Sequence, residues 1–226
     1  MKKAFSLILA LVMCLSLCAC GGVNSEKETS PTAFLTEMTW KGTDKFNKEF
    51  RATFQEGGTG TYNGNECVWE IYDNVVTVSY KAQYGQANLD FEVMEHNGVT
   101  MLRGSYTFLL PAEGYKEACA AKQDYMLSVA SNLNWTAAHD LKLANEAKAV
   151  LEYEGKIVKW TATVYEIGSS YAQLSDRYED GWPVNSITVY MNTEELVKLE
   201  NRQEVTIVGI LNVQYSNTMY CGIVLE

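Results

Sequence analysis

Short runs of alternating polar and apolar residues, separated by turn-forming pairs, dominate the chain between residues 36 and 110. In the run 48–55, Phe50, Ala52 and Phe54 alternate with polar residues, a period of two that is typical of strands with one buried face. The pairs between the runs are Gly57-Gly58, Asn63-Gly64, Asp73-Asn74 and Asn97-Gly98. Because Asn-Gly fits the type I′ turn of a β-hairpin, the pattern predicts an antiparallel meander of about seven or eight short strands, closed or nearly closed.

Particular segments of this region match a known layout. They are Trp40 with Gly42 after it, the segment 54–60 (FQEGGTG), Trp69-Glu70-Ile71, and the segment 74–78 (NVVTV). They resemble the small lipocalin-like domains of bacterial lipoproteins, and the resemblance implies a small β-barrel.

The predicted inner faces of these strands carry several large aromatic residues, namely Phe50, Phe54, Trp69, Tyr80 and Phe91. Strands of about six residues form a barrel whose interior the side chains themselves tend to fill. We therefore expect these residues to form the barrel core. The alternative hypothesis is a cavity in this first barrel that carries a small apolar ligand.

The periodicity changes in the second half of the chain. Residues 114–132 and 136–153 have helical composition, with a break between them, and the Thr136 hydroxyl is expected to cap the second helix. Alternation then returns in five runs, at 156–167, 170–175, 186–191, 203–211 and 218–226, with a short amphipathic helix predicted at 193–200. Five strands with a helix between the third and the fourth is the element order of an OB fold.

A spaced motif leads into the first of these strands. It has the form N-x3-A-x3-Y-x-G-K and consists of Asn145, Ala149, Tyr153, Gly155 and Lys156. Further matching residues are Val158, Val164, Ile167, Leu199 and the segment 203–209 (QEVTIVG). Together they resemble the bacterial tRNA_anti-like OB-fold proteins, many of them secreted lipoproteins. That family usually has glycine where this chain has Ala162 and Arg202, so we expect a bulge to replace the glycine bend in the first strand.

The N-terminal segment is expected to be an export signal. Lys2 and Lys3 precede an apolar run from Ala4 to Leu17, which is shorter than the about 20 residues that span a bilayer but suits a signal peptide. The sequence Leu17-Cys18-Ala19-Cys20 resembles the lipobox of bacterial lipoproteins. The resemblance implies cleavage before Cys20 and a diacylglyceryl group on its thiol; an ordinary cleaved secretory peptide is the alternative.

The charge of the chain argues against nucleic acid as a ligand. The formal net charge is −10, and residues 131–226 contain 7 Lys and Arg against 13 Asp and Glu. A groove that follows a phosphate backbone needs a positive stripe. We expect no nucleic-acid partner.

Aromatic residues with interleaved acidic ones gather where OB folds bind oligosaccharides or oligonucleotides, on the second and third strands and their loops. They are Tyr165, Tyr171, Tyr178, Trp182 and Tyr190, with Asp176, Glu179 and Asp180 between them. Such a surface suits a sugar, a peptide or a cationic group. The alternative is that these aromatic side chains pack against the helices or against the first barrel.

Other chemistry finds little support in the sequence. His96 and His139 lie in different predicted domains, and no hydrolase, zinc or phosphate-binding motif is present. The segment 176–181 lacks calcium-loop spacing and is interpreted as a solvated acidic loop. We therefore expect no catalytic residues, no metal and no cofactor.

The cysteines after Cys20 are Cys67, Cys119 and Cys221. Cys67 shares a predicted face with Trp69 and Ile71, and Cys221 shares one with Met219, Ile223 and Leu225, so both are expected to be buried. Free thiols are favoured over a Cys67–Cys119 disulfide because the count is odd.

These observations predict a mainly β protein with bridging helices. The expected parts are a signal peptide (1–19), a lipidated Cys20 with a flexible tether (20–33), a lipocalin-like meander or small barrel (34–112), a helical bridge (113–135) and a five-stranded OB-like barrel (136–226). The predicted location is the extracytoplasmic face of the cell membrane. The predicted function is non-catalytic binding of an oligosaccharide, peptide or envelope component on the OB face. The alternatives are a structural or interaction module of an envelope complex and the apolar-ligand carrier.

Overall fold

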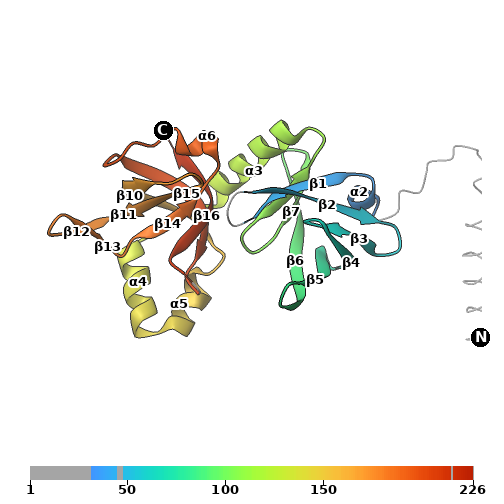
Figure 1. Cartoon of the computed structure of the whole chain (residues 1–226), viewed down its shortest axis with the longest axis horizontal. Coiled ribbons are helices and arrows are strands. Elements are labelled where there is room, and N and C mark those ends of the chain that lie inside the picture. Colours follow the sequence, from blue (N-terminus) through green and yellow to red (C-terminus); the bar gives the residue numbers. More distant parts are fainter. Residues whose placement is uncertain (1–31, 45–47, 215, 226) are drawn as a thin grey trace, which may run out of the picture. The chain divides into compact units, whose positions relative to one another are not determined.

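Eight antiparallel strands close into a barrel in the first half of the chain (Figure 1). The computed structural model describes residues 32–44, 48–214 and 216–225; the predicted signal, Cys20 and most of the predicted tether lie outside them. Each strand pairs with its neighbours in sequence, and β1 also pairs with β8. A short helix α2 (Ala33–Thr36) precedes the strands β1 (Thr39–Thr43), β2 (Glu49–Gln55), β3 (Thr59–Tyr62), β4 (Asn65–Tyr72), β5 (Val75–Ala82), β6 (Gly85–His96), β7 (Val99–Arg103) and β8 (Phe108–Pro111). The predicted closed meander is confirmed.

The turn chemistry explains this topology. Asn63 and Gly64, between β3 and β4, have φ angles of 49° and 78°, and Asn97 and Gly98, between β6 and β7, have 51° and 73°. Positive φ at both central residues is the requirement of a type I′ turn, which matches the twist of the flanking strands. The Asn-Gly pairs therefore join adjacent antiparallel strands, as the sequence predicts.

Large side chains pack together in the first barrel. Trp40 is fully buried, and its indole N–H donates to the Leu35 carbonyl oxygen at 3.2 Å. A Cβ at Gly42 would lie 2.7 Å from both Leu109 Cδ2 and Phe50 Cζ, so any larger residue would require these side chains to shift. Of the predicted core residues, Phe50, Phe54, Trp69 and Phe91 are buried and Tyr80 packs against them.

Three helices follow the first barrel: α3 (Tyr115–Val129), α4 (Trp135–Ala144) and α5 (Glu146–Tyr153). The single helix predicted for residues 136–153 is wrong, because Asn145 ends α4 and caps α5, its side chain accepting from the Lys148 N–H at 3.0 Å. The predicted cap at Thr136 is wrong as well. Asn134 takes that role and accepts from the Ala137 N–H, because Trp135 already has a helical conformation.

The second barrel has the strand order of an OB fold. Its main strands are β10 (Ile157–Ile167), β11 (Tyr171–Ser175), β14 (Ile187–Tyr190), β15 (Glu204–Asn212) and β16 (Thr218–Leu225). The strand β10 pairs with β11, β11 with β14, β14 in parallel with β16, β16 with β15, and β15 with β10. The helix α6 (Thr193–Leu196) lies between the third and fourth strands. The OB-like barrel is therefore confirmed, with α6 ending earlier than predicted.

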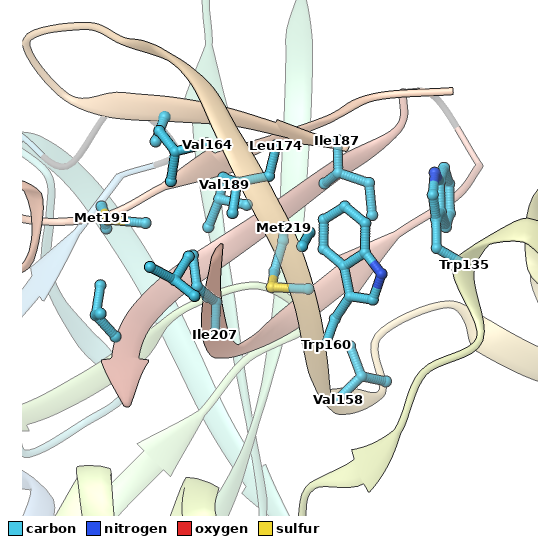
Figure 2. Close-up of a cluster of buried hydrophobic side chains, with 14 of the residues drawn as sticks. Trp135, Val158, Trp160, Val164, Leu174, Ile187, Val189, Met191, Ile207 and Met219 are labelled. Atoms are coloured by element: carbon cyan, nitrogen blue, oxygen red, sulfur yellow. The ribbon is translucent and has the colours of Figure 1, made fainter. Parts of the chain in front are cut away.

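The core of this second barrel draws side chains from every main strand. Figure 2 shows Trp160, Val189 and Met219 close together in this cluster. Trp135 belongs to the same cluster, and the two-residue strand β9 (Ser131–Asn132) pairs with β10. Contacts with the second barrel therefore begin a few residues before the expected boundary at residue 136.

Three residues of the motif that resembles the tRNA_anti-like family have clear structural roles. Asn145 caps α5, Ala149 is fully buried, and Gly155 has φ of 70°, which turns the chain from α5 into β10. A left-handed backbone at this point favours glycine. The spacing of the motif therefore fixes how one short helix connects to the first strand.

Two positions differ from that family. The bend in β10 is a bulge, as expected: Val164 pairs with Leu174 and Glu166 with Gln173, so Tyr165 is the extra residue. The other position, Arg202, has φ of 67°. Left-handed backbone is unfavourable for a residue with a Cβ, so Arg202 carries conformational strain.

We expect Arg202→Gly to raise the free energy of unfolding by about 0.5–1 kcal/mol, because glycine relieves this strain although it also loosens the unfolded chain. Urea titration followed by circular dichroism measures the change. Asn201→Gly is the matched control: its φ is not positive, so only the loss of stability from glycine flexibility is expected there. A variant at residue 202 that is no more stable than the native protein would contradict the strain argument.

Residues 34–226 form one compact unit, and a third buried cluster contains side chains from both barrels and α3. Its buried members are Met101, Phe108, Leu110, Ala118, Met126, Ile157, Val208, Ile210 and Ile223. The prediction that Cys221 shares a face with Met219 is wrong. The register of β16 shifts between Tyr220 and Ile223, so Met219 packs in the second barrel core while Cys221 packs against this third cluster.

Candidate functional site

The outer face of the second barrel, on β10, β11 and β14, collects three of the five predicted aromatic residues. Ala172 and Leu174 of β11 and Ile187 and Val189 of β14 are fully buried, so strand alternation places Tyr171 and Tyr190 on the opposite, outer face. Tyr165 reaches the same neighbourhood from its bulge in β10. Its hydroxyl group donates to Gln173 Oε1 and contacts Ser186 Oγ at 3.1 Å.

The aromatic rings on this face continue beyond the predicted residues. The Tyr171 and Tyr190 rings meet edge to face with centroids 6.3 Å apart. Tyr190 stacks on Tyr220 of β16 at 5.5 Å, with an angle of 9° between the ring planes. Tyr220 in turn contacts Tyr106 of the first barrel at 5.2 Å. We call the rings of Tyr171, Tyr190, Tyr220 and Tyr106 the tyrosine row.

Carboxylate groups hold both ends of the tyrosine row. The Tyr171 hydroxyl donates to Glu166 Oε1 at 2.8 Å, and this bond raises the pKa of Tyr171. At the other end the Tyr106 hydroxyl donates to Glu154 Oε1, and Glu154 Oε2 accepts from the Val213 N–H at 2.7 Å. The phenol groups at the two ends of the row therefore have fixed orientations.

Tyr178 and Trp182 come from an additional hairpin, formed by β12 (Arg177–Glu179) and β13 (Trp182–Val184). Its turn residues Asp180 and Gly181 have φ of 49° and 82°. Residues 176–181 are exposed, as the interpretation of a solvated acidic segment expects. They form part of a hairpin and not a loop, because Asp-Gly between two short extended segments makes a type I′ turn.

The two faces of this hairpin differ. Partial burial raises the pKa of Tyr178, with Tyr165 adding to the effect and Arg202 opposing it, so Tyr178 lies near the β10 side of the tyrosine row. Trp182 pairs with Glu179 and alternates with Tyr178 across the hairpin, which puts its indole on the other face. Its side chain is 76% exposed. The structure thus brings Tyr165, Tyr171, Tyr178 and Tyr190 together and leaves Trp182 apart.

The sequence reasoning missed Tyr220, Tyr106, Glu166 and Gln173. A signal for Tyr220 was present, since it alternates with the buried Met219 in a strand. Tyr106 lies in the loop between β7 and β8, far away in sequence. Only the packing of the two barrels brings it to the end of the row.

Asp176, His96 and His139 each have a structural contact. Asp176, in the segment considered for calcium, accepts from the Trp160 indole N–H at 3.2 Å. His96 contacts Asp124 at 2.7 Å, whereas His139 packs against the Trp135 ring. Within the described ranges, no group of three His, Cys, Asp or Glu side chains is placed to hold a metal ion. No helix in those same ranges is long and apolar enough to cross a membrane.

Cys67, Cys119 and Cys221 have free thiols, and Cys67 belongs to the first barrel core whereas Cys119 packs against the third cluster. The placement favours the expected free thiols over a Cys67–Cys119 bond.

Comparison with known proteins adds no relative to this picture. No family model, no curated protein and no solved structure matches the chain.

Proposed function

We propose that this chain is a non-catalytic binding protein of the cell envelope that holds an oligosaccharide on the outer face of its second barrel. The observation that supports this proposal is the tyrosine row, a line of oriented phenol rings on the strands where OB folds bind their ligands. Flat aromatic faces pack well against the apolar faces of sugar rings.

The polar groups along the row suit a neutral or weakly basic polyol. Glu166 and Gln173 offer acceptor oxygens beside the rings, and Ser186 adds a hydroxyl group. Hydroxyl groups of a sugar can donate to such oxygens. The excess of acidic residues in this half of the chain disfavours a polyanion such as nucleic acid.

The location is part of the same proposal. A diacylglyceryl group on Cys20 would provide the two acyl chains needed for stable membrane attachment. The protein would then display its barrels on the extracytoplasmic face of the cell membrane, where envelope glycans and peptides are within reach. Mass spectrometry of the protein from membranes tests this part: a diacylated Cys20 is expected at the mature N-terminus, and an unmodified terminus elsewhere would exclude it.

A structural or interaction module of an envelope complex is the second candidate. The observation in its favour is Trp182, because a large indole that is 76% exposed is typical of a protein contact. The apolar-ligand carrier has less support, because aromatic side chains pack together inside the first barrel.

The variants Tyr171→Ala and Tyr190→Ala test the sugar site. Each is expected to weaken binding of an oligosaccharide selected on a glycan array by about tenfold or more, because buried aromatic contacts at a site are typically worth over 1 kcal/mol. Calorimetric titration measures the affinity. Tyr72→Ala is the matched control, because Tyr72 is 85% exposed on the first barrel.

The outcomes separate the candidates. Loss of binding in both variants with an unchanged Tyr72→Ala protein supports the sugar site. Binding of tetrapeptides in place of glycans would change the ligand class. No hit on the array, together with capture of an envelope protein that depends on Trp182, would replace the proposal by the interaction module. A large fall in thermal stability for Tyr171→Ala would assign that ring a purely structural role.

A further inference from the structure

A cavity of about 710 Å³ is lined by residues of both barrels, and none of the four rings of the tyrosine row lines it. Its walls come from β1, β2 and β8 of the first barrel, from α3, and from residues 169–170, 191–195 and 221–223 of the second barrel. This volume falls within the about 300–1,000 Å³ of typical small-molecule sites, which are often found between domains. Both barrels and α3 therefore contribute walls to one open cavity.

The charge of this cavity differs from that of the chain as a whole. Lys48, Lys116 and Lys122 line it, although the chain carries a net charge of −10. Within the part of the chain that the structure describes, no carboxylate lies within ion-pair distance of these three ammonium groups. The lysines are therefore available to an anion from outside.

Two of the acidic residues on the wall already have partners. Glu49 Oε2 is 3.5 Å from Lys41 Nζ. The Glu195 carboxylate is 3.2 Å from Lys198 Nζ and accepts from the Val224 N–H at 2.7 Å. These contacts partly neutralise two of the three wall carboxylates, so the three lysines face one further carboxylate, that of Glu194.

The deeper wall is apolar. It is formed by Phe108, Leu110, Met191 and Ile223 together with the Cys119 and Cys221 thiols. The first two and Ile223 belong to the buried cluster that joins the barrels. A ligand with an apolar body can therefore displace water from this wall while its charged end remains near the lysines.

The backbone at Cys221 adds an independent observation. Its φ is 55°, which is unusual for a residue that is neither Gly, Asn nor Asp. The register shift in β16 at this point directs the thiol toward the Tyr106 carbonyl oxygen, 3.7 Å away. Bulges and strained residues of this kind occur preferentially next to functional sites.

We infer that this cavity binds an amphipathic anion, a single carboxylate or phosphate group on a short apolar body. Lys116 and Lys122 on α3, with Lys48 from β2's N-terminal side, hold the anionic group, and the Phe108–Leu110 wall receives the apolar part. None of the four tyrosines of the row lines this cavity, so the inference does not rest on the proposed sugar site. Because its walls come from both barrels, an occupied cavity also stabilises their packing.

Isothermal titration of the purified protein with decanoate and with decyl phosphate tests the inference. Both are expected to bind, with decanol as the uncharged comparison binding at least about tenfold more weakly. The double variant Lys116→Gln/Lys122→Gln is expected to lose about tenfold or more in affinity for both anions. Binding that weakens as salt is raised is expected as well.

Lys148→Gln/Lys159→Gln is the matched control, since it removes the same charge from exposed positions outside the cavity. It should bind the anions as the native protein does. The inference is overturned if neither anion binds, if decanol binds as tightly as decanoate, or if both double variants lose affinity equally. Tyr171→Ala should leave anion binding unchanged, so this result is independent of the test of the sugar site.

Discussion

Replacing Trp135 with alanine is expected to lower the free energy of unfolding by about 3–5 kcal/mol. The Trp135 side chain is fully buried and packs in the core of the second barrel. Its indole N–H donates to the Asn185 carbonyl oxygen in the loop before β14. The substitution therefore leaves a large cavity and removes the hydrogen bond of a carbonyl group, two effects that add to the loss of stability.

Trp182→Ala is the matched control, because it removes the same side chain from a site that is 76% exposed. Its effect on stability should stay within about 0.5 kcal/mol. Urea unfolding followed by far-ultraviolet circular dichroism suits both variants, since each loses an indole and fluorescence would change for trivial reasons. Similar losses in the two variants would contradict the placement of Trp135 in the core.

The role of Trp135 also shows what the sequence leaves open. Residues 114–132 have helical composition, and Trp135 lies in the expected break after them, so the sequence groups it with the helical bridge. In the structure it starts α4 and contacts a barrel whose main strands begin more than twenty residues later. A single apolar residue at a helix start carries no periodic signal. Only tertiary packing determines which domain such a residue packs against.

The barrels themselves were predictable because their signals are local. Alternation fixes which side chains of β2, β4 and β5 face inward, and Asn-Gly pairs fix which strands are neighbours. The OB order followed from five alternating runs and one short helix. Failures occur where one residue changes the period. The bulge at Cys221 and Gly222 moves Cys221 to the face opposite Met219, and the Asp180-Gly181 turn was hidden between segments of only three residues.

The candidate site was predictable in part for the same reason. Alternation placed Tyr190 on the outer face, and the structure agrees. Tyr106 could not be assigned to the row, because its contact with Tyr220 depends on how two separately coded barrels pack. The role of Glu154 could not be predicted for the same reason, because its carboxylate connects a loop of the second barrel to Tyr106 of the first. Contacts between elements that are distant in sequence leave no local pattern.

Gly60→Ala is expected to lower the free energy of unfolding by about 1–3 kcal/mol, through steric overlap alone. Gly60 lies in β3 opposite Phe54 and Cys67, and its φ is not positive. A Cβ at this position would lie 2.1 Å from the Thr53 carbonyl oxygen. That oxygen belongs to the backbone of β2, so a change of side-chain rotamer cannot relieve the overlap and the two strands must separate.

Gly64→Ala separates steric overlap from backbone strain. Gly64 has φ of 78° and open space around its Cβ direction, so its substitution is expected to cost about 1 kcal/mol from backbone strain alone. Thermal and urea unfolding of both variants measure the difference.

The Trp69 indole N–H donates to the Thr59 carbonyl oxygen at 2.9 Å and thereby holds β3 in place. Separation of β2 from β3 should therefore also change the near-ultraviolet circular dichroism of Gly60→Ala, and an unchanged spectrum with native stability would refute the close approach of these strands. The glycine that ends the 54–60 motif is then required by strand proximity, whereas Gly57 and Gly58, with φ of 88° and 79°, serve the turn.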